Sequence, residues 1–303
     1  MVSSVVFRRK TLSAINSVRI FRWVSTEAKG SEVMLTRHSG GDKGILTLSL
    51  NRPKAKNALS RSLVGDFRRA LEEIRSDKDV RVVVLHSSVP GVFCAGADLK
   101  ERATMSAIEV EQFLYSMKTA FKELEGLPQP TIAALDGAAL GGGFELSLCC
   151  DLRVAGPRAV LGLPETSLAI IPGAGGTLRL TKLIGPSQTK ALVFTARRFG
   201  PYPALSMGIV NDVVEAAECM DEKDTSDHNL GYERALHWAR QILPNGPIAV
   251  RMAKRAIDHA STADPSSGLD IEQLCYAQVI PTEDRLEGLR AFKEKRKPVY
   301  KGC

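Results

Sequence analysis

Two carboxylates in the middle of the chain each follow a glycine-containing segment. Glu145 lies two residues after the glycines at 141–143, and Glu165 follows Gly162, Leu163 and Pro164. Glycine lets the backbone approach a ligand closely because it has no Cβ. The N–H groups at a helix start are unpaired and carry partial positive charge, so they can stabilise a developing oxyanion. Two acids beside such groups predict proton transfer next to a polarised carbonyl.

The glycine-rich turn at 141–143 also has simpler interpretations than an oxyanion hole. Such a strand-to-helix turn is often only a tight turn or a phosphate-binding loop. No Lys-Ser or Lys-Thr pair follows these glycines, which excludes a P-loop, and their spacing does not match the dinucleotide-binding fingerprint. A single Glu in a helix is most often solvated. The functional interpretation therefore needs support from a further segment of the chain.

Residues 92–100 form that further segment and offer a second donor for an oxyanion. They follow a strand-like apolar run, and the small residues at 94–97 again allow close backbone approach. An oxyanion hole needs two donors that converge from different chain segments, so the N–H of Ala97 could pair with that of Gly142. The simpler alternative is an ordinary strand-to-helix connection in which Asp98 caps the helix.

The periodicity of the apolar residues indicates the elements that must position these groups. Strands are predicted at 45–50, 80–86, 131–135, 152–155 and 209–214, and helices at 59–75 and 106–127. This alternation predicts an α/β fold with right-handed crossovers. From residue 229 onward the pattern is helical, with helices predicted at 229–243, 247–261, 267–278 and 282–295. The polar run at 215–229 predicts a surface loop.

Four motifs in chain order resemble those of the crotonase (enoyl-CoA hydratase) superfamily: residues 95–100, 141–145, 163–165 and 172–177. Residues 91–102 and 281–288 further resemble its mitochondrial branch, which includes methylglutaconyl-CoA hydratase and enoyl-CoA hydratase-like enzymes. The resemblance implies a crotonase-type ββα spiral core at 35–228 and a C-terminal helical region at 229–303 that forms trimers. Two such trimers make a hexamer in the family.

The same resemblance implies a hydratase that adds water to a 2-enoyl-CoA, of either a short-chain or a 3-methylglutaconyl type. Glu145 would activate the water, Glu165 would supply the α-proton, and the N–H groups of Ala97 and Gly142 would hold the thioester oxygen. The acyl-CoA is then the substrate, and neither a separate cofactor nor a metal is expected. Contacts to coenzyme A and substrate are implied for Lys54, Ala55, Lys56, Ala58, Ala95, Gly96, Asp98, Leu99, Lys100, Gly141, Pro164, Gly173, Phe292 and Lys295.

Other functions stay open at this point. An enoyl-CoA isomerase or an acyl-CoA hydrolase could use the same oxyanion hole, although the presence of both acids favours hydration and speaks against an inactive scaffold. A different class is AU-rich RNA binding, which is associated with one relative in this branch and would use the basic residues at 54–69. Basic residues alone give weak, salt-sensitive binding, so RNA is not the expected partner.

Composition and charge restrict the class of protein and its location. A hydrophobic content of 44% and a charged content of 25% are typical of a globular protein, and no apolar run reaches the ~18 residues of a membrane helix. The six cysteines lack disulfide-like or metal-like spacing and are expected to be reduced thiols. Residues 1–26 hold five basic residues and no acidic one, which predicts a mitochondrial transit peptide at 1–28 and a matrix location, or a plastid in a plant.

Overall fold

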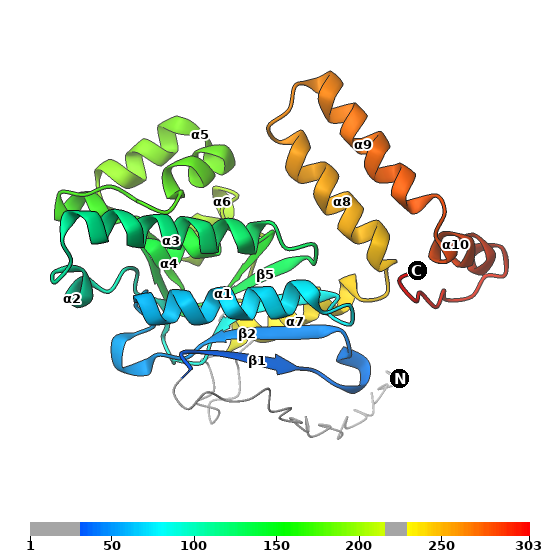
Figure 1. Ribbon diagram of the computed structural model, residues 1–303, viewed down its shortest axis with the longest axis horizontal. Helices are drawn as coiled ribbons and strands as arrows, with labels where there is room; N and C mark the ends of the chain where they lie inside the picture. The colour runs from blue at the N-terminus through cyan, green and yellow to red at the C-terminus, as the bar shows by residue number, and fades with distance from the viewer. Residues whose placement is uncertain (1–30, 216–228) are drawn as a thin grey trace, which may run out of the picture.

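The computed structural model describes residues 31–215 and 229–303, which contain two β-sheets covered by helices (Figure 1). The larger sheet has the strand order β1-β2-β3-β5-β7-β10, and the smaller sheet has the order β4-β6-β8-β9. The pairs β1–β2 and β8–β9 are antiparallel, and the other pairs are parallel. The strands are β1 Val33–Arg37, β2 Ile45–Leu50, β3 Val82–Ser87, β4 Val92–Cys94, β5 Thr131–Leu135, β6 Ala138–Leu140, β7 Leu152–Ala155, β8 Val160–Gly162, β9 Arg198–Phe199 and β10 Asp212–Val213.

Helices connect these strands and continue beyond them to the C-terminus. The α-helices are α1 Arg61–Ser76, α2 Leu99–Arg102, α3 Ala107–Glu125, α4 Gly142–Ser147, α5 Gly176–Phe194, α6 Pro201–Ser206, α7 Leu230–Ile242, α8 Pro247–Ala260, α9 Pro265–Val279 and α10 Glu283–Lys293. Three short 3₁₀ helices are also present within the described residues: η1 Gly40–Asp42, η2 Pro53–Ala55 and η3 Glu165–Leu168.

The chain repeats one winding pattern through both sheets. A strand of the larger sheet is followed by a strand of the smaller sheet and then by helix, as in β3-β4-α2-α3, β5-β6-α4 and β7-β8-η3-α5. This is the predicted ββα spiral. Each turn of the spiral therefore ends at a strand-to-helix junction of the smaller sheet, and those junctions carry the motifs with possible chemistry.

Apolar side chains on both faces of the larger sheet hold the layers together. Leu46, Leu48 and Leu50 point to the main core with α1 and α3, while Ile45 points to the opposite face. Helix α7 covers that opposite face. Strands that are buried on both faces read as nearly continuous apolar runs, which is why β2 and β3 were recognisable in the sequence.

Helices α8 and α9 pack against each other and extend away from the sheets, and α10 lies at the end of the molecule opposite to α2 (Figure 1). Large apolar side chains on these helices, or directly after α9, are exposed: Ile257, Leu269, Leu274, Tyr276, Ile280, Leu286, Leu289 and Phe292. By contrast, α7 packs on the larger sheet, although it lies in the segment predicted to mediate assembly. No helix in the described part of the chain is long and apolar enough to cross a membrane.

Several of the predicted elements are present and others differ from the prediction. Strands β2, β5 and β7 have the predicted bounds. The strand predicted at 209–214 is too long, because the N–H of Ile209 bonds to the carbonyl of Ala204 at the end of α6 and leaves only β10 to pair. The short strands β4, β6 and β8 and the helix α5 were not predicted. The predicted transit peptide at 1–28 and nearly all of the loop predicted at 215–229 lie outside the described residues.

Candidate active site

The N–H of Gly142 lies at the first residue of a buried helix. Strand β6 ends at Leu140, Gly141 caps α4, and Gly142 begins it. The N–H groups of a first helical turn have no partner within the helix. The close approach of α4 to β4 depends on Gly143, because a Cβ at that position would lie 2.7 Å from the Cβ of Cys94. The start of α4 is therefore held directly against the end of β4.

The backbone nitrogen of Ala97 lies near Gly142, and its N–H is not used by the neighbouring segment. The N–H of Leu59 donates to the carbonyl of Gly96 over 2.7 Å, and its carbonyl accepts from the N–H of Asp98 over 3.0 Å. These two bonds form an isolated parallel bridge between Leu59 and Ala97, so the N–H of Ala97 itself faces away from Leu59. A Cβ built on Gly142 would lie 3.7 Å from the nitrogen of Ala97. The two N–H groups are thus neighbours from different segments.

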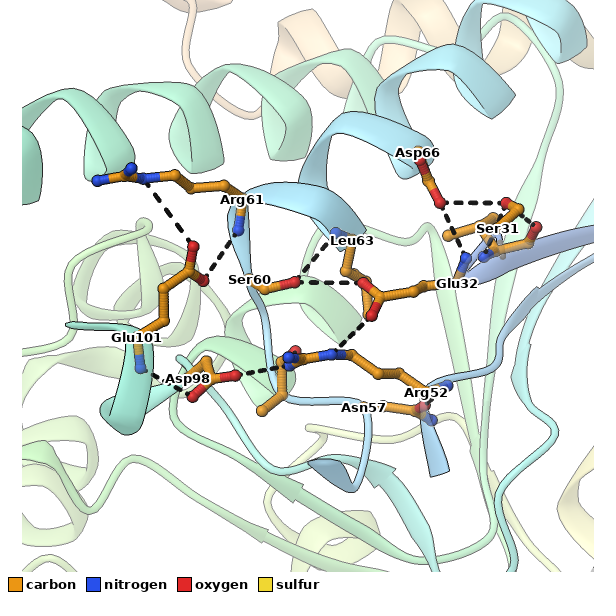
Figure 2. A network of polar contacts seen from close by, with 12 residues as sticks. Ser31, Glu32, Arg52, Asn57, Ser60, Arg61, Leu63, Asp66, Asp98 and Glu101 are labelled. Carbon is orange, nitrogen blue, oxygen red and sulfur yellow. Dashed lines mark hydrogen bonds and ion pairs between the residues drawn. The ribbon is translucent and has the colours of Figure 1, made fainter. Parts of the chain in front are cut away.

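A charged network on the other side of this turn fixes its conformation. Figure 2 shows the guanidinium of Arg52 between Glu32 and Asp98, at N···O distances of 2.7 Å to each carboxylate. Arg52 also donates to the carbonyl of Ala58 over 2.8 Å. The carboxylate of Asp98 caps α2, and the hydrogen bond from Arg52 is the main reason why its pKa is lowered. The network joins the segments on both sides of Ala97.

Replacing Arg52 by Met is expected to lower the free energy of unfolding by about 1.5–3 kcal/mol, because Glu32 and Asp98 lose a charged donor. Arg61→Met is the matched control: the Arg61 side chain is 51% exposed beside Glu101 and Glu109, and the expected change is within about 0.5 kcal/mol. Urea unfolding measures both. The stability from a lowered carboxyl pKa is present at neutral pH and is lost as pH falls through that pKa, so the Arg52 effect should shrink in acid. Equal losses for the two variants would contradict this account.

The predicted coenzyme A segments lie side by side. The N–H of Ala95 donates to the carbonyl of Lys56 over 3.1 Å, which places residues 54–58 next to residues 95–100. Within these segments Ala58 and Gly96 are buried, whereas Lys54, Lys56, Ala95, Leu99 and Lys100 are exposed and Ala55 and Asp98 are half-buried. The exposed side chains can meet a ligand from solvent. Their contacts to coenzyme A stay a prediction.

Asn57 is a structural part of this site that the sequence analysis missed. It is fully buried, with φ of 54°, a left-handed conformation that Asn tolerates better than most residues. Its Oδ1 accepts from the N–H of Arg52 over 2.7 Å, and its Nδ2 donates to Ser87 Oγ and to the carbonyl of Phe93. Asn57 therefore ties the predicted coenzyme A segment to β3 and β4. The sequence signal for such a turn was an Asn shortly after Pro53.

Glu145 is buried on α4 and is held by two backbone donors. Glu145 is only 1% exposed. Its Oε1 accepts hydrogen bonds from the N–H of Ala174 over 2.8 Å and from the N–H of Gly176 over 2.7 Å. Burial raises the pKa of Glu145, and the two hydrogen bonds oppose that rise. Its Oε2 accepts no hydrogen bond from the residues that the structure describes, so one carboxylate oxygen is held and the other is available to a ligand.

Glu165 begins η3 and lies beside the start of α4. A Cβ built on Gly141 would lie 3.0 Å from Oε1 of Glu165. Oε2 of Glu165 is buried and has no hydrogen-bond partner in the described ranges. Burial raises the pKa of Glu165 to about 7, and the charge of Glu145 contributes to that rise. A carboxyl group with this pKa can give or take a proton near neutral pH, which is what acid–base catalysis requires.

The structure places the remaining predicted contacts in two different regions. Pro164 caps η3 next to Glu165, and Gly173 precedes the turn that holds Glu145. Phe292, 85% exposed, lies on α10, and Lys295 follows that helix, at the end of the molecule away from α2 and α4 (Figure 1). Within one chain these two residues do not join the acids. Their predicted role applies to the site of a neighbouring copy and stays a prediction.

Metal-binding and disulfide chemistry find no counterpart at this site. Residues 31–215 and 229–303 contain no group of three or more His, Cys, Asp or Glu side chains that could hold a metal ion. The five cysteines within these ranges are free: Cys94, Cys149, Cys150, Cys275 and Cys303.

Comparison with known proteins identifies the family. Residues 40–303 match the profile of the enoyl-CoA hydratase/isomerase family. The chain belongs to this family. Probable enoyl-CoA hydratase 2, mitochondrial, of Arabidopsis thaliana is 50% identical over 270 residues, which cover 89% of this chain and 86% of the relative. Human methylglutaconyl-CoA hydratase, mitochondrial, is 48% identical over 282 residues, which cover 93% of this chain and 81% of the relative. The predicted resemblance is confirmed.

A solved structure of the enoyl-CoA hydratase/isomerase family has the same fold. The crystal structure of enoyl-CoA hydratase from Bacillus anthracis aligns with a TM-score of 0.82 and 44% sequence identity, over 90% of this chain and all of that chain (100%). The predicted fold class, an α/β spiral core followed by C-terminal helices, is therefore confirmed.

Proposed function

We propose that this protein is an enoyl-CoA hydratase that adds water across the double bond of a 2-enoyl-CoA. The observation that carries the proposal is the pairing of two carboxyl groups, buried Glu145 and half-buried Glu165, with the neighbouring backbone N–H groups of Ala97 and Gly142, for which the described residues provide no hydrogen-bond partner. Membership of the enoyl-CoA hydratase/isomerase family supports the same activity. The coenzyme A thioester is the substrate, and the reaction needs no further cofactor.

In the proposed mechanism the N–H groups of Ala97 and Gly142 bind the thioester oxygen, where negative charge gathers in the transition state. Ionised Glu145 orients a water through Oε2 and takes its proton as the water oxygen bonds to the β-carbon. Glu165, protonated at the start, gives its proton to the α-carbon. One water is consumed and the pair keeps one proton, so no co-reactant is required. The positive end of the α4 dipole adds to the stabilisation of the oxyanion.

The two acids favour hydration over the other reactions considered for this fold. An isomerase moves one proton between two carbons of the substrate, and a hydrolase attacks the thioester carbon. An isomerase does not need a carboxylate that is held for a water. A hydrolase does not need a second, protonated carboxyl group to supply the α-carbon, such as Glu165 with its pKa of about 7. RNA binding gains no support, because Arg61 and Arg68 in the basic segment pair with Glu109 and Glu123.

We expect kcat/KM to fall above about pH 7 in both directions of the reaction. The reason is that Glu145 and Glu165 share one proton, which is lost as pH rises through the raised pKa of Glu165, about 7. Hydration takes up no net proton, so its equilibrium constant is independent of pH, and hydration and dehydration must share this limb. Initial rates between weakly acidic and alkaline pH measure it with 2-enoyl-CoA and 3-hydroxyacyl-CoA. Flat profiles in both directions would contradict a role for a proton on Glu165.

We further infer the acyl group, location and assembly from the relatives and the surface. Relatives at 50% and 48% identity carry the names probable enoyl-CoA hydratase 2 and methylglutaconyl-CoA hydratase, so short-chain and 3-methylglutaconyl thioesters are the substrates to compare. They would place the enzyme in fatty-acid or leucine breakdown.

Both names include "mitochondrial", which supports a mitochondrial location. The exposed apolar side chains of α9 and α10 support a homo-oligomer, which light scattering tests.

A further inference from the structure

The turn that holds Glu145 is itself held by an arginine. Arg179 lies near the start of α5, its side chain 14% exposed. Its Nη1 donates to the carbonyl of Ala174 over 3.0 Å. Its Nε and Nη2 donate to the two carboxylate oxygens of Glu125, over 3.0 Å and 2.7 Å. The fork of the guanidinium therefore joins the turn at 174–176 to the C-terminal end of α3 in a fixed orientation.

Arg179 and Glu145 both form hydrogen bonds to the backbone of the turn at 174–176. The N–H groups of Ala174 and Gly176 donate to Glu145, while the carbonyl of Ala174 accepts from Arg179. Between them Gly175 has φ of 104°, and a Cβ there would overlap the guanidinium of Arg179. The turn thus takes a conformation that suits glycine, packed against the guanidinium. If the contact to Arg179 were lost, both donors to Glu145 would be free to shift.

We propose that Arg179 is a positioning residue for the acid–base reaction: through the turn at 174–176 it orients Glu145 and keeps it in the ionised form that activates water. This inference rests on the hydratase function proposed above. Arg179 touches neither the reacting atoms nor the predicted coenzyme A segments, so its effect is transmitted by two backbone N–H groups and by its charge.

The charges around Glu145 make Arg179 the main cation available for this role. Glu165 on η3, the Cys149 thiol after α4 and Lys118 on α3 also interact electrostatically with Glu145. Burial raises the pKa of Glu145, whereas Arg179 and Lys118 lower it. Lys118 is exposed to solvent, which screens its charge, while Arg179 is largely buried. Removing Arg179 should therefore let the pKa of Glu145 rise further.

Arg179→Met and Arg179→Lys, made in the full chain, test the proposal. Arg179→Met is expected to lower kcat for crotonyl-CoA about 10-fold or more, with KM within about 3-fold, and to move the acidic limb of the kcat/KM profile to higher pH. Arg179→Lys keeps the charge and should return the limb toward its wild-type position. Arg68→Met is the matched control, because Arg68 makes the same two-pronged pair with Glu123 on α3 but does not touch the turn. It should leave kcat and the limb unchanged.

A second readout separates this proposal from the hydratase function itself. The pKa of the Glu145 carboxyl can be followed by NMR in protein carrying ¹³C at the glutamate carboxyl carbons, with Glu145→Gln to assign the signal. The proposal expects a higher pKa in Arg179→Met and recovery in Arg179→Lys. An unchanged pKa and an unchanged acidic limb, with only a lower melting temperature, would overturn it. A wild-type protein that turns over no enoyl-CoA would overturn the proposed function instead, and the NMR comparison would still decide the role of Arg179 in holding Glu145.

Discussion

Glu165→Gln is expected to lower kcat for hydration about 10²–10⁴-fold, because Gln cannot supply the α-proton. The protein itself should stay folded. Burial raises the pKa of Glu165 to about 7, so ionising it in the folded protein costs free energy that the unfolded chain does not pay. Its contribution to stability therefore falls as pH rises from the usual carboxyl pKa through about 7. Glu165→Gln lacks this loss and should be more stable relative to the wild type at pH above 7 than in acid.

Glu145→Gln is expected to lose activity by a similar factor of about 10²–10⁴, for the complementary reason that an amide cannot take a proton from water. The amide oxygen of Gln can still accept the N–H groups of Ala174 and Gly176, so the turn should keep its place. Glu111→Gln, on the exposed surface of α3, is the control that should leave kcat unchanged. Loss of the conjugated enoyl-thioester absorbance measures all three. Near-normal turnover in either acid variant, with intact near-UV circular dichroism, would contradict the assigned roles.

Gly142→Pro tests the oxyanion hole by removing one backbone N–H. Gly142 is the first residue of α4, the helical position at which Pro is best tolerated. Loss of one oxyanion donor typically lowers kcat about 10²–10³-fold. Gly142→Ala is the matched control, because it adds a Cβ but keeps the N–H. That Cβ would meet Leu59 Cδ1 at 2.9 Å, the far end of a flexible side chain, and the same contact exists in both variants.

The ratio of kcat between Gly142→Ala and Gly142→Pro then separates the effect of losing the N–H from the effect of the added Cβ. We expect it to be about 10²-fold or larger, with similar melting temperatures for the two variants. Stopped-flow or steady-state hydration rates supply the ratio, and binding of a non-reactive acyl-CoA shows whether the substrate still enters. Equal kcat values for the two variants would mean that the thioester oxygen is not held by Gly142.

The acids and the glycine-rich turn were predictable from sequence because each depends on residues close together in the chain. Glycines at 141–143 followed by Glu145 mark a helix start with a carboxylate in its first turn. The apolar runs of β2, β5 and β7 are equally local, because parallel strands buried on both faces need continuous apolar sequence. Asp98 as a cap of α2 also followed from its place before a helix.

Other features depended on contacts between distant segments and left no local pattern. The direction of the Ala97 N–H follows from the bridge to Leu59, and no periodicity reports a bridge between single residues. Strands β4, β6 and β8 have three residues each, too few for alternation to be recognised. Helix α5 was missed because its pattern is broken at Gly185, where φ is 78°, and at Pro186. Arg179 acquires its role only when α5 meets α3 and the turn beside Glu145.

The most direct test of the central claim is the mass of the product made from a 2-enoyl-CoA. Purified protein would be incubated with crotonyl-CoA and, separately, with 3-methylglutaconyl-CoA, and the products analysed by mass spectrometry. The account predicts a product that retains coenzyme A and is heavier than the substrate by one water, formed from at least one of the two thioesters and lost in Glu145→Gln and Glu165→Gln. A product of unchanged mass would indicate isomerisation, and free coenzyme A would indicate hydrolysis. Either of these, or no turnover of either thioester, would contradict a hydratase built on these two acids.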